Sequence, residues 1–256
     1  MQHIMTMLQP LVTYSFHNTI WRMEIDDHSD IMVLELRNEQ EKQVSFASLN
    51  LRSGEQYFTD YKTEERWLTG VEGVYGNVAL LHYYKHETGP EHKGIIAIGA
   101  VTSAALWSNY SMAFDHLSIN GPVAYNTNLS PKKLLLADIK TGEVLRSYES
   151  ADKPLPNNIV IPTLTAASQF VPGMLPDEPY GNIVHYLNHN NYRIVSLHTF
   201  KNNVLQQHLF ILDGSEVVYR DLLNSDIQKL QPEAFVLHKN VLVYIKNRTE
   251  INVLNL

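Results

Sequence analysis

Two stretches of the sequence place a tyrosine and a histidine at a similar spacing around a turn. Tyr75-Gly76-Asn77 precedes an apolar run that carries His82, and Tyr180-Gly181-Asn182 precedes one that carries His185. Glycine supplies the positive φ that such a turn needs, so one interpretation is a structural turn that the chain uses twice. The functional hypothesis is that the two tyrosines and two histidines line one ligand-binding pocket.

A proline-rich loop offers two acidic side chains to the same kind of site. Residues Phe170–Tyr180 contain three prolines, two acids and two aromatic residues, one of which is the tyrosine that ends them. Loops on a rigid scaffold often carry binding residues, and prolines reduce the entropy that the loop loses when it becomes ordered. We therefore predict that Asp177 and Glu178 bind a ligand. The alternative is a surface insertion that packs back on its own sheet.

Metal binding is the next chemistry that the histidines raise. The chain has 12 histidines, and five of them fall on or beside predicted inner strands: His82, His116, His185, His198 and His238. Imidazole is a common metal ligand, but the spacing does not align these five at one depth. We prefer histidines that form hydrogen bonds between sheets, and we predict no metal site and no cofactor.

Two polar clusters differ from known metal motifs. The segment Asp26–Asp30 has oxygen donors for Ca²⁺ but lacks the spacing, glycine and final glutamate of an EF-hand loop, so we predict a turn. In His86–His92 the two histidines are six residues apart, and Gly89-Pro90 excludes the helix of a zinc protease motif. We predict a hairpin loop at this second segment.

The acidic residues carry the one enzymatic alternative. Glu72, Asp115, Asp177 and Glu178 lie nearest the predicted inner strands and loops, and a carboxylate pair that flanks a glycosidic bond hydrolyses sugars. The sequence contains no nucleophile elbow, P-loop or dinucleotide fingerprint. It also lacks cysteine, which excludes disulfides and thiolate chemistry. We expect a non-enzymatic binding protein, with a carbohydrate-active hydrolase as the alternative.

Short apolar strands are the elements that position these residues. Runs such as Ile31–Leu36, Val78–Tyr84 and Ile95–Val101 are rich in strand-forming residues and end at Gly, Asn or Asp. The one fair helical window, Ser225–Ala234, is cut short by Pro232. Several strands are apolar on both faces, which indicates sheets stacked on sheets. The sequence therefore predicts an all-β fold.

A hairpin with a glycine turn repeats along the chain and indicates the architecture. Gly54 and Gly142 end two such turns and are 88 residues apart, or twice 44, and Gly214 ends a third. A period of about 44 residues is that of a propeller blade. We predict a five-bladed β-propeller whose N-terminal strand, Val12–Ile25, closes the last blade and places Trp21 like Trp107 of blade two. The predicted blades cover about residues 26–62, 66–111, 112–150, 157–224 and 231–256, in one domain of residues 1–256.

The hairpin of the predicted third blade resembles the blades of known proteins. Leu135–Leu145 combines a strand ending in Asp, a Thr-Gly-Glu turn and an apolar outer strand. This pattern is similar to the blade signature of quinoprotein-like and WD40-like β-propellers, and the whole chain resembles a family of uncharacterised Bacteroidetes proteins. The resemblance implies a bacterial propeller and no particular activity, because propellers host enzymes and binding platforms alike. The sequence contains no quinone-binding set of residues.

Composition and charge limit the partners. The formal net charge of −7 argues against nucleic-acid binding. No apolar run reaches the roughly 18 residues of a membrane helix, and the N-terminus lacks the pattern of a signal peptide. We expect a cytoplasmic monomer that presents one face or its central funnel to a protein or a small polar ligand.

Overall fold

Antiparallel strands make up nearly all of the regular structure. The computed structural model describes residues 8–170 and 173–256, and its one helical element in these residues is a 3₁₀ turn, η1 (Ala167–Gln169). This confirms the all-β prediction. Residues 226–234 form no helix, in line with the position of Pro232. No helix in the described residues is long and apolar enough to cross a membrane.

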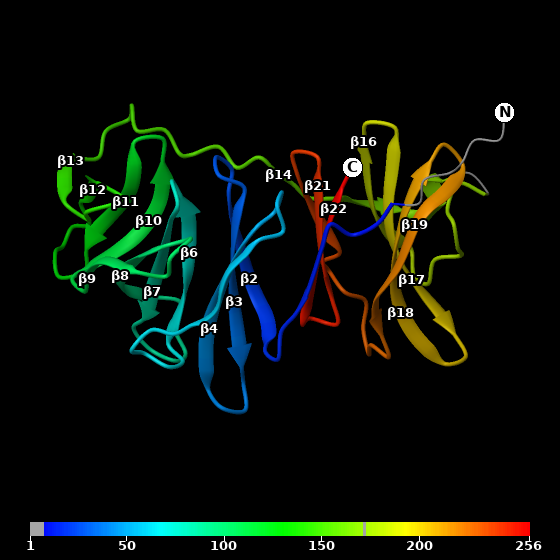
Figure 1. The fold of residues 1–256 in the computed structure, drawn as a ribbon, viewed down its shortest axis with the longest axis horizontal. Coiled ribbons are helices and arrows are strands. Elements are labelled where there is room, and N and C mark those ends of the chain that lie inside the picture. Colours follow the sequence, from blue (N-terminus) through cyan, green and yellow to red (C-terminus); the bar gives the residue numbers. More distant parts are fainter. Residues whose placement is uncertain (1–7, 171–172) are drawn as a thin grey trace. The chain divides into compact units, whose positions relative to one another are not determined.

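The chain divides into two units, which we describe separately. The central unit comprises Asn18–Asn157, and the terminal unit combines Met1–His17 with Asn158–Leu256. Every sheet lies within one of the two units, and the strands of each can be followed in Figure 1. That the units form a single domain stays a prediction.

The central unit contains three four-stranded sheets whose strands follow the order of the sequence. The first sheet contains β2 (Thr19–Asp26), β3 (Ile31–Asn38), β4 (Gln43–Asn50) and β5 (Gln56–Tyr61). The second contains β6 (Thr69–Tyr75), β7 (Val78–Tyr84), β8 (His92–Gly99) and β9 (Ala105–Asn109). The third contains β10 (Met112–Ser118), β11 (Gly121–Asn126), β12 (Leu134–Ala137) and β13 (Val144–Ser147). The second and third sheets fall within the predicted repeats.

The predicted glycine turns join neighbouring strands. Gly54 precedes β5, Gly142 precedes β13, and both have a positive φ, of 72° and 73°. At Gly142 a second constraint applies, because a Cβ would lie 2.5 Å from the ring of Trp107. The indole Nε1 of Trp107 donates to the carbonyl of Ile139 at 2.9 Å. The turn therefore fixes the Trp107 ring against the third sheet.

Apolar side chains fill the space between the sheets of the central unit. One buried cluster joins β3 and β4 to β7 and β8 through residues such as Val33, Phe46 and Leu81. A second joins β7 and β8 to β10 and β11. The middle sheet is thus covered on both faces, which explains why its strands are apolar on both sides.

The terminal unit contains two five-stranded sheets. One contains β15 (Thr163–Ala166), β16 (Ile183–His189), β17 (Tyr192–Lys201), β18 (Val204–Asp213) and β19 (Glu216–Ser225). The other has the order β1 (Val12–Ser15), β22 (Glu250–Asn255), β21 (Val241–Lys246), β20 (Phe235–His238) and β14 (Ile159–Val160). Gly214 lies in the turn between β18 and β19, as predicted.

The N-terminal strand joins the C-terminal strands, in part as predicted. Val12–Ser15 pairs with β22 in a register that sets Val12 opposite Val253. The prediction for the residues that follow is wrong, because Thr19–Asp26 pairs with β3 and begins the first sheet of the central unit. Trp21 consequently lies on β2, the first strand of its sheet, whereas Trp107 lies on β9, the last strand of its sheet.

The proline-rich loop packs back on the sheet that it leaves. Phe170 and Leu175 contact the buried cluster formed by β16, β17 and β18, and the ring of Phe170 lies 5.1 Å from that of Tyr186. This agrees with the structural alternative for the loop. Val171 and Pro172 lie outside the described residues.

Candidate functional site

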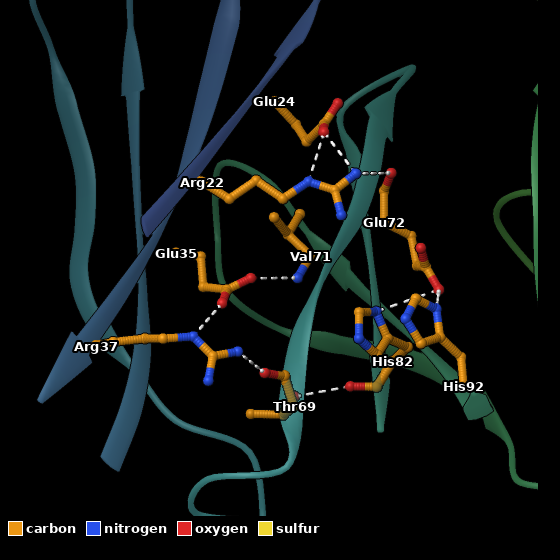
Figure 2. A network of polar contacts seen from close by, with 9 residues as sticks. All are labelled: Arg22, Glu24, Glu35, Arg37, Thr69, Val71, Glu72, His82 and His92. Atoms are coloured by element: carbon orange, nitrogen blue, oxygen red, sulfur yellow. Dashed lines mark hydrogen bonds and ion pairs between the residues drawn. The ribbon is translucent and has the colours of Figure 1, made fainter. Parts of the chain in front are cut away.

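Three polar side chains meet on neighbouring strands of the second sheet, as Figure 2 shows. Glu72 lies on β6, His82 on β7 and His92 on β8. The pairing of β6 with β7 skips Glu72, and that of β7 with β8 skips Gly94, so each neighbouring pair contains a β-bulge. Because bulges redirect side chains, the three residues share one face of the sheet. We call them the Glu-His-His cluster.

Both histidines place Nδ1 close to one carboxylate oxygen. Glu72 Oε1 lies 2.6 Å from Nδ1 of His92 and 3.1 Å from Nδ1 of His82. The two imidazole rings stack with centroids 3.6 Å apart and planes 8° from parallel, and Tyr84 meets both rings edge-on. The three potential ligand atoms all lie within 4.8 Å of one another.

His82 is the most buried member of the cluster. Its side chain is 0% exposed, compared with 25% for His92. Neither ring nitrogen of His82 has a hydrogen-bond partner in the part of the chain that the structure describes, since Glu72 lies near Nδ1 but off the hydrogen-bond direction. A buried polar atom without a partner costs about 1–3 kcal/mol, so His82 is held in place at the expense of stability.

The protonation states follow from burial and proximity. Burial raises the pKa of Glu72, but the neighbouring His82 and His92 outweigh this effect and lower that pKa to about 2. Burial also lowers the pKa of His82, and the Glu72 carboxylate opposes that shift only in part. At neutral pH the cluster therefore pairs an anionic carboxylate with a neutral His82 imidazole.

A buried ion pair fastens β6 to the first sheet. Glu35 on β3 accepts a hydrogen bond from Nε of Arg37 at 2.6 Å and another from the backbone N–H of Val71 at 3.0 Å. Arg37 also donates to the carbonyl of Thr69 at 3.0 Å. These bonds hold β6 at Thr69 and at Val71, on either side of Gly70, which faces His82.

Gly70 has no side chain, and this allows the Glu35–Arg37 ion pair and the Glu-His-His cluster to lie next to each other. A Cβ on Gly70 would lie 2.8 Å from Cε1 of His82 and 2.9 Å from Oε2 of Glu35. On the other side of the cluster, Arg22 lies 2.8 Å from Glu24 and donates to the carbonyl of Glu72 at 3.4 Å. The cluster therefore lies inside a charged network rather than in an apolar core.

An aromatic cavity of about 310 Å³ lies elsewhere in the central unit. Four of its lining side chains are aromatic, and the rings of Tyr83 and Tyr110 stack with centroids 6.0 Å apart. Burial raises the pKa of Tyr83, so its hydroxyl stays neutral at physiological pH. The complete lining is Tyr61, Lys62, Thr63, Glu64, Tyr83, Ile96, Ala105, Leu106, Trp107, Ser108 and Tyr110.

The structure brings the predicted ligand residues of the central unit together only in part. His82 belongs to the Glu-His-His cluster. Tyr75 is half-buried at the turn between β6 and β7 and pairs with Val78, whereas His82 pairs with Gly70 near the other end of this hairpin. That Tyr75 binds a ligand stays a prediction.

The predicted ligand residues of the terminal unit have structural partners. His185 Nε2 lies 3.0 Å from the carbonyl of Pro232, and the backbone N–H of Tyr180 donates to the carbonyl of His198 at 2.6 Å. Tyr180 also ends a loop rather than turning a hairpin as Tyr75 does. The partner of His185 lies in the segment between β19 and β20 and not in a second sheet.

The two acidic residues of the loop differ from each other. Both carboxylate oxygens of Asp177 accept hydrogen bonds from Nζ of Lys201, at 2.9 and 2.7 Å, and Glu178 is exposed. In the central unit Asp115 forms ion pairs with Lys132 and His116. A ligand-binding role for Asp177 and Glu178 and the hydrolase alternative stay predictions.

Sequence reasoning missed His92 and its link to Glu72. Residues 86–91 form the loop of the β7–β8 hairpin, as predicted for this segment, whereas His92 begins β8 and pairs with Tyr84. The available signal was Gly94, whose positive φ of 72° marks the bulge. Asp26–Asp30 does form a turn between β2 and β3, as predicted.

Comparisons with known proteins assign no activity. Residues 25–107 match the model of a domain of unknown function (DUF4905). This region runs from the end of β2 into β9 and contains the whole Glu-His-His cluster, but it is less than half of the 256 residues. No curated protein matches the chain.

Three solved structures are distantly similar to this chain. BamB from Moraxella catarrhalis is 10% identical, with 92% of this chain and 84% of that chain covered and a TM-score of 0.37. Hydrazine synthase from Kuenenia stuttgartiensis is 10% identical, with 87% and 64% covered and a TM-score of 0.31. Raptor from Chaetomium thermophilum is 8% identical, with 97% and 29% covered and a TM-score of 0.31. At these values the similarities support no argument about function.

Proposed function

We propose that this chain is a non-enzymatic binding protein, built as a five-bladed β-propeller, whose aromatic cavity holds a small polar ligand. Five antiparallel sheets of four or five strands in the described residues support the blade count. The pairing of β1 with β22 supports closure of the last blade by the N-terminal strand, because such pairing covers an edge that would otherwise stay open.

The aromatic cavity is the observation that carries the binding role. Its volume of about 310 Å³ lies at the lower end of the range for small-molecule sites. Aromatic rings provide apolar contact area, and tyrosine hydroxyls add hydrogen bonding at little cost in side-chain entropy. Lys62 and Glu64 place one charge of each sign at the same cavity.

This lining favours a compact ligand with both a flat apolar face and polar groups. Tyr110 is 57% exposed and stacks on Tyr83, so the pair presents an open aromatic surface. Trp107 is held by its hydrogen bond to Ile139 and by Gly142, which makes this wall of the cavity rigid. A preformed wall lowers the entropy cost of binding.

A thermal-shift screen tests the proposal. The full chain is melted with a panel of soluble sugars, nucleosides and amino acids, each at millimolar concentration. A ligand at 100 times its Kd stabilises the folded state by about 2.7 kcal/mol, which raises Tm by roughly 5–11 °C for a chain of this size. One chemical class should produce this shift, and calorimetry should give one site per chain.

Matched tyrosine variants place the site. Tyr110→Ala should weaken binding of the identified ligand at least tenfold without lowering Tm of the free protein, because the side chain is largely exposed. Tyr148→Ala, outside the cavity in the same unit, should leave the affinity unchanged. The proposal fails if no compound stabilises the chain, or if Tyr110→Ala binds as tightly as the parent.

A further inference from the structure

We propose that the Glu-His-His cluster binds a divalent transition-metal ion, zinc in the first instance, through Glu72 Oε1 and the Nδ1 atoms of His82 and His92. This revises our sequence-based prediction of no metal site. It is independent of the aromatic cavity, because His82 and Tyr83 are consecutive on β7 and point to opposite faces of the sheet.

The donor set selects the class of ion. Two imidazoles and one carboxylate suit zinc and other first-row divalent ions, whereas Ca²⁺ and Mg²⁺ prefer oxygen ligands alone. The chain has no cysteine, so no thiolate is available to favour Cu(I). Three protein ligands leave a fourth position for water or for a group from a bound molecule.

The distances are close to those that a zinc ion requires. Zinc binds nitrogen and oxygen ligands at about 2.0–2.1 Å, so tetrahedral geometry sets ligand atoms about 3.3 Å apart. Oε1 of Glu72 lies 3.1 Å from Nδ1 of His82 and 2.6 Å from Nδ1 of His92. The three ligand atoms all lie within 4.8 Å of one another, but the two rings are stacked 8° from parallel. Binding therefore requires that the rings rotate toward one point and that the proton between His92 and Glu72 leaves.

The unpartnered ring of His82 is the second and independent observation. His82 is fully buried, and both of its ring nitrogens lack a hydrogen-bond partner among the described residues. Its ring stacks on that of His92 and lies so close to Gly70 that a Cβ there would collide with it. An ion bound at Nδ1 would supply the partner that this buried nitrogen lacks.

The net charge of the network favours a cation. Glu24 and Glu35 balance Arg22 and Arg37, so the net charge of −1 in the network drawn in Figure 2 is that of the Glu72 carboxylate itself. Each guanidinium is paired with a carboxylate other than Glu72. Arg22 lies 2.8 Å from Glu24, and Arg37 lies 2.6 Å from Glu35. His92, which is 25% exposed, provides the route from solvent to the site.

Zinc binding to the full chain tests the inference. The protein is stripped with EDTA, dialysed into chelator-free buffer and titrated with zinc chloride by isothermal calorimetry, and bound metal is then measured by mass spectrometry. We expect one zinc ion per chain with a micromolar or lower Kd. Titration with Co²⁺ should produce the intense visible absorption of a tetrahedral nitrogen–oxygen site, a signal that does not depend on any variant.

Variants assign the ligands. His92→Ala removes the most exposed member and should weaken zinc binding at least tenfold, and Glu72→Gln should do the same. His116→Ala is the matched control, because His116 lies beside Asp115 in the same unit but outside the cluster. Circular dichroism checks that each variant is folded, and if His92→Ala does not fold, His92→Gln takes its place.

Two results would overturn the inference. One is an unmodified chain that binds neither zinc nor cobalt stoichiometrically. The other is a folded His92 variant that retains the affinity and the cobalt spectrum of the parent. Neither result bears on ligand binding at the aromatic cavity, which the thermal-shift screen measures with metal-free protein.

Discussion

Arg37 makes the contact between sheets whose loss should be most damaging, and Arg37→Met tests this. Arg37 and Glu35 are only 9% and 1% exposed, and Nε of Arg37 lies 2.6 Å from Glu35. The guanidinium also lies 5.3 and 4.9 Å from the ring centroids of Trp21 and Trp67. Methionine retains most of the aliphatic volume, so the variant removes the charge and the hydrogen bonds while leaving a small cavity.

The expected cost follows from the carboxylate that is left behind. Removing one partner of a buried ion pair costs about 3–5 kcal/mol, because the remaining charge is buried without compensation. The two cation–π contacts, which are also lost, contribute about 0.5–1 kcal/mol each at partly exposed sites. Their loss is included in the expected total of about 3–5 kcal/mol. For a chain of this size, a loss of about 3–5 kcal/mol lowers Tm by roughly 6–20 °C.

Urea unfolding followed by tryptophan fluorescence measures this loss, since Trp21 and Trp67 both report on the site. The double variant Arg37→Met/Glu35→Gln should recover at least 1 kcal/mol or so, because glutamine is neutral and still accepts the N–H of Val71. Lys62→Met, in an exposed pair with Asp60, should change stability by no more than about 1 kcal/mol. A loss below about 1 kcal/mol in Arg37→Met, or no recovery in the double variant, would refute the reasoning.

Two further predictions concern the terminal unit. Burial lowers the pKa of His198 to about 4, and its Nε2 accepts the N–H of Gln231 at 3.0 Å. In the unfolded chain this histidine titrates near pH 6.5, so between pH 6.5 and 4 the unfolded state binds more protons, and the free energy of unfolding should fall as pH drops through this range. Urea unfolding at pH 7 and pH 5 measures this change. A His198→Gln variant that loses as much stability between the two pH values as the parent would contradict the prediction. Deleting residues 1–15 removes β1 and uncovers β22, so we expect a lower Tm and aggregation in light scattering, and unchanged melting would count against this.

The parts of the fold that local chemistry determines could be predicted from the sequence. Glycine turns such as those at Gly54 and Gly142 need a positive φ that few other residues adopt, and both turns were found where the repeat places them. Two-sided apolar strands correctly indicated stacked sheets. The boundary between β1 and β2 was missed, because a strand of residues 12–25 reads as continuous in composition although its two parts pair with different partners.

The candidate site could not be predicted because long-range register creates it. His82 was recognised as a candidate, but its partner Glu72 was considered only as a hydrolase acid and His92 only as part of a loop. Their convergence depends on two bulges, at Glu72 and Gly94, and strand spacing alone gives no register between β6, β7 and β8. The matching Tyr-Gly-Asn motif was misleading for a similar reason, since the same tripeptide turns a hairpin at Tyr75 and ends a loop at Tyr180.

The pairing of β1 with β22 has a consequence for how the protein is made. Thr13 and Asn252, which share a hydrogen bond in this sheet, are 239 residues apart. A growing chain leaves the ribosome from its N-terminus, so β1 must wait without its partner until the last strand has been synthesised. Contacts of such long sequence separation form slowly. The three sheets of residues 18–157, whose strands are all neighbours in sequence, have no such delay, and we expect them to acquire protection from hydrogen exchange well before the sheet that contains β1.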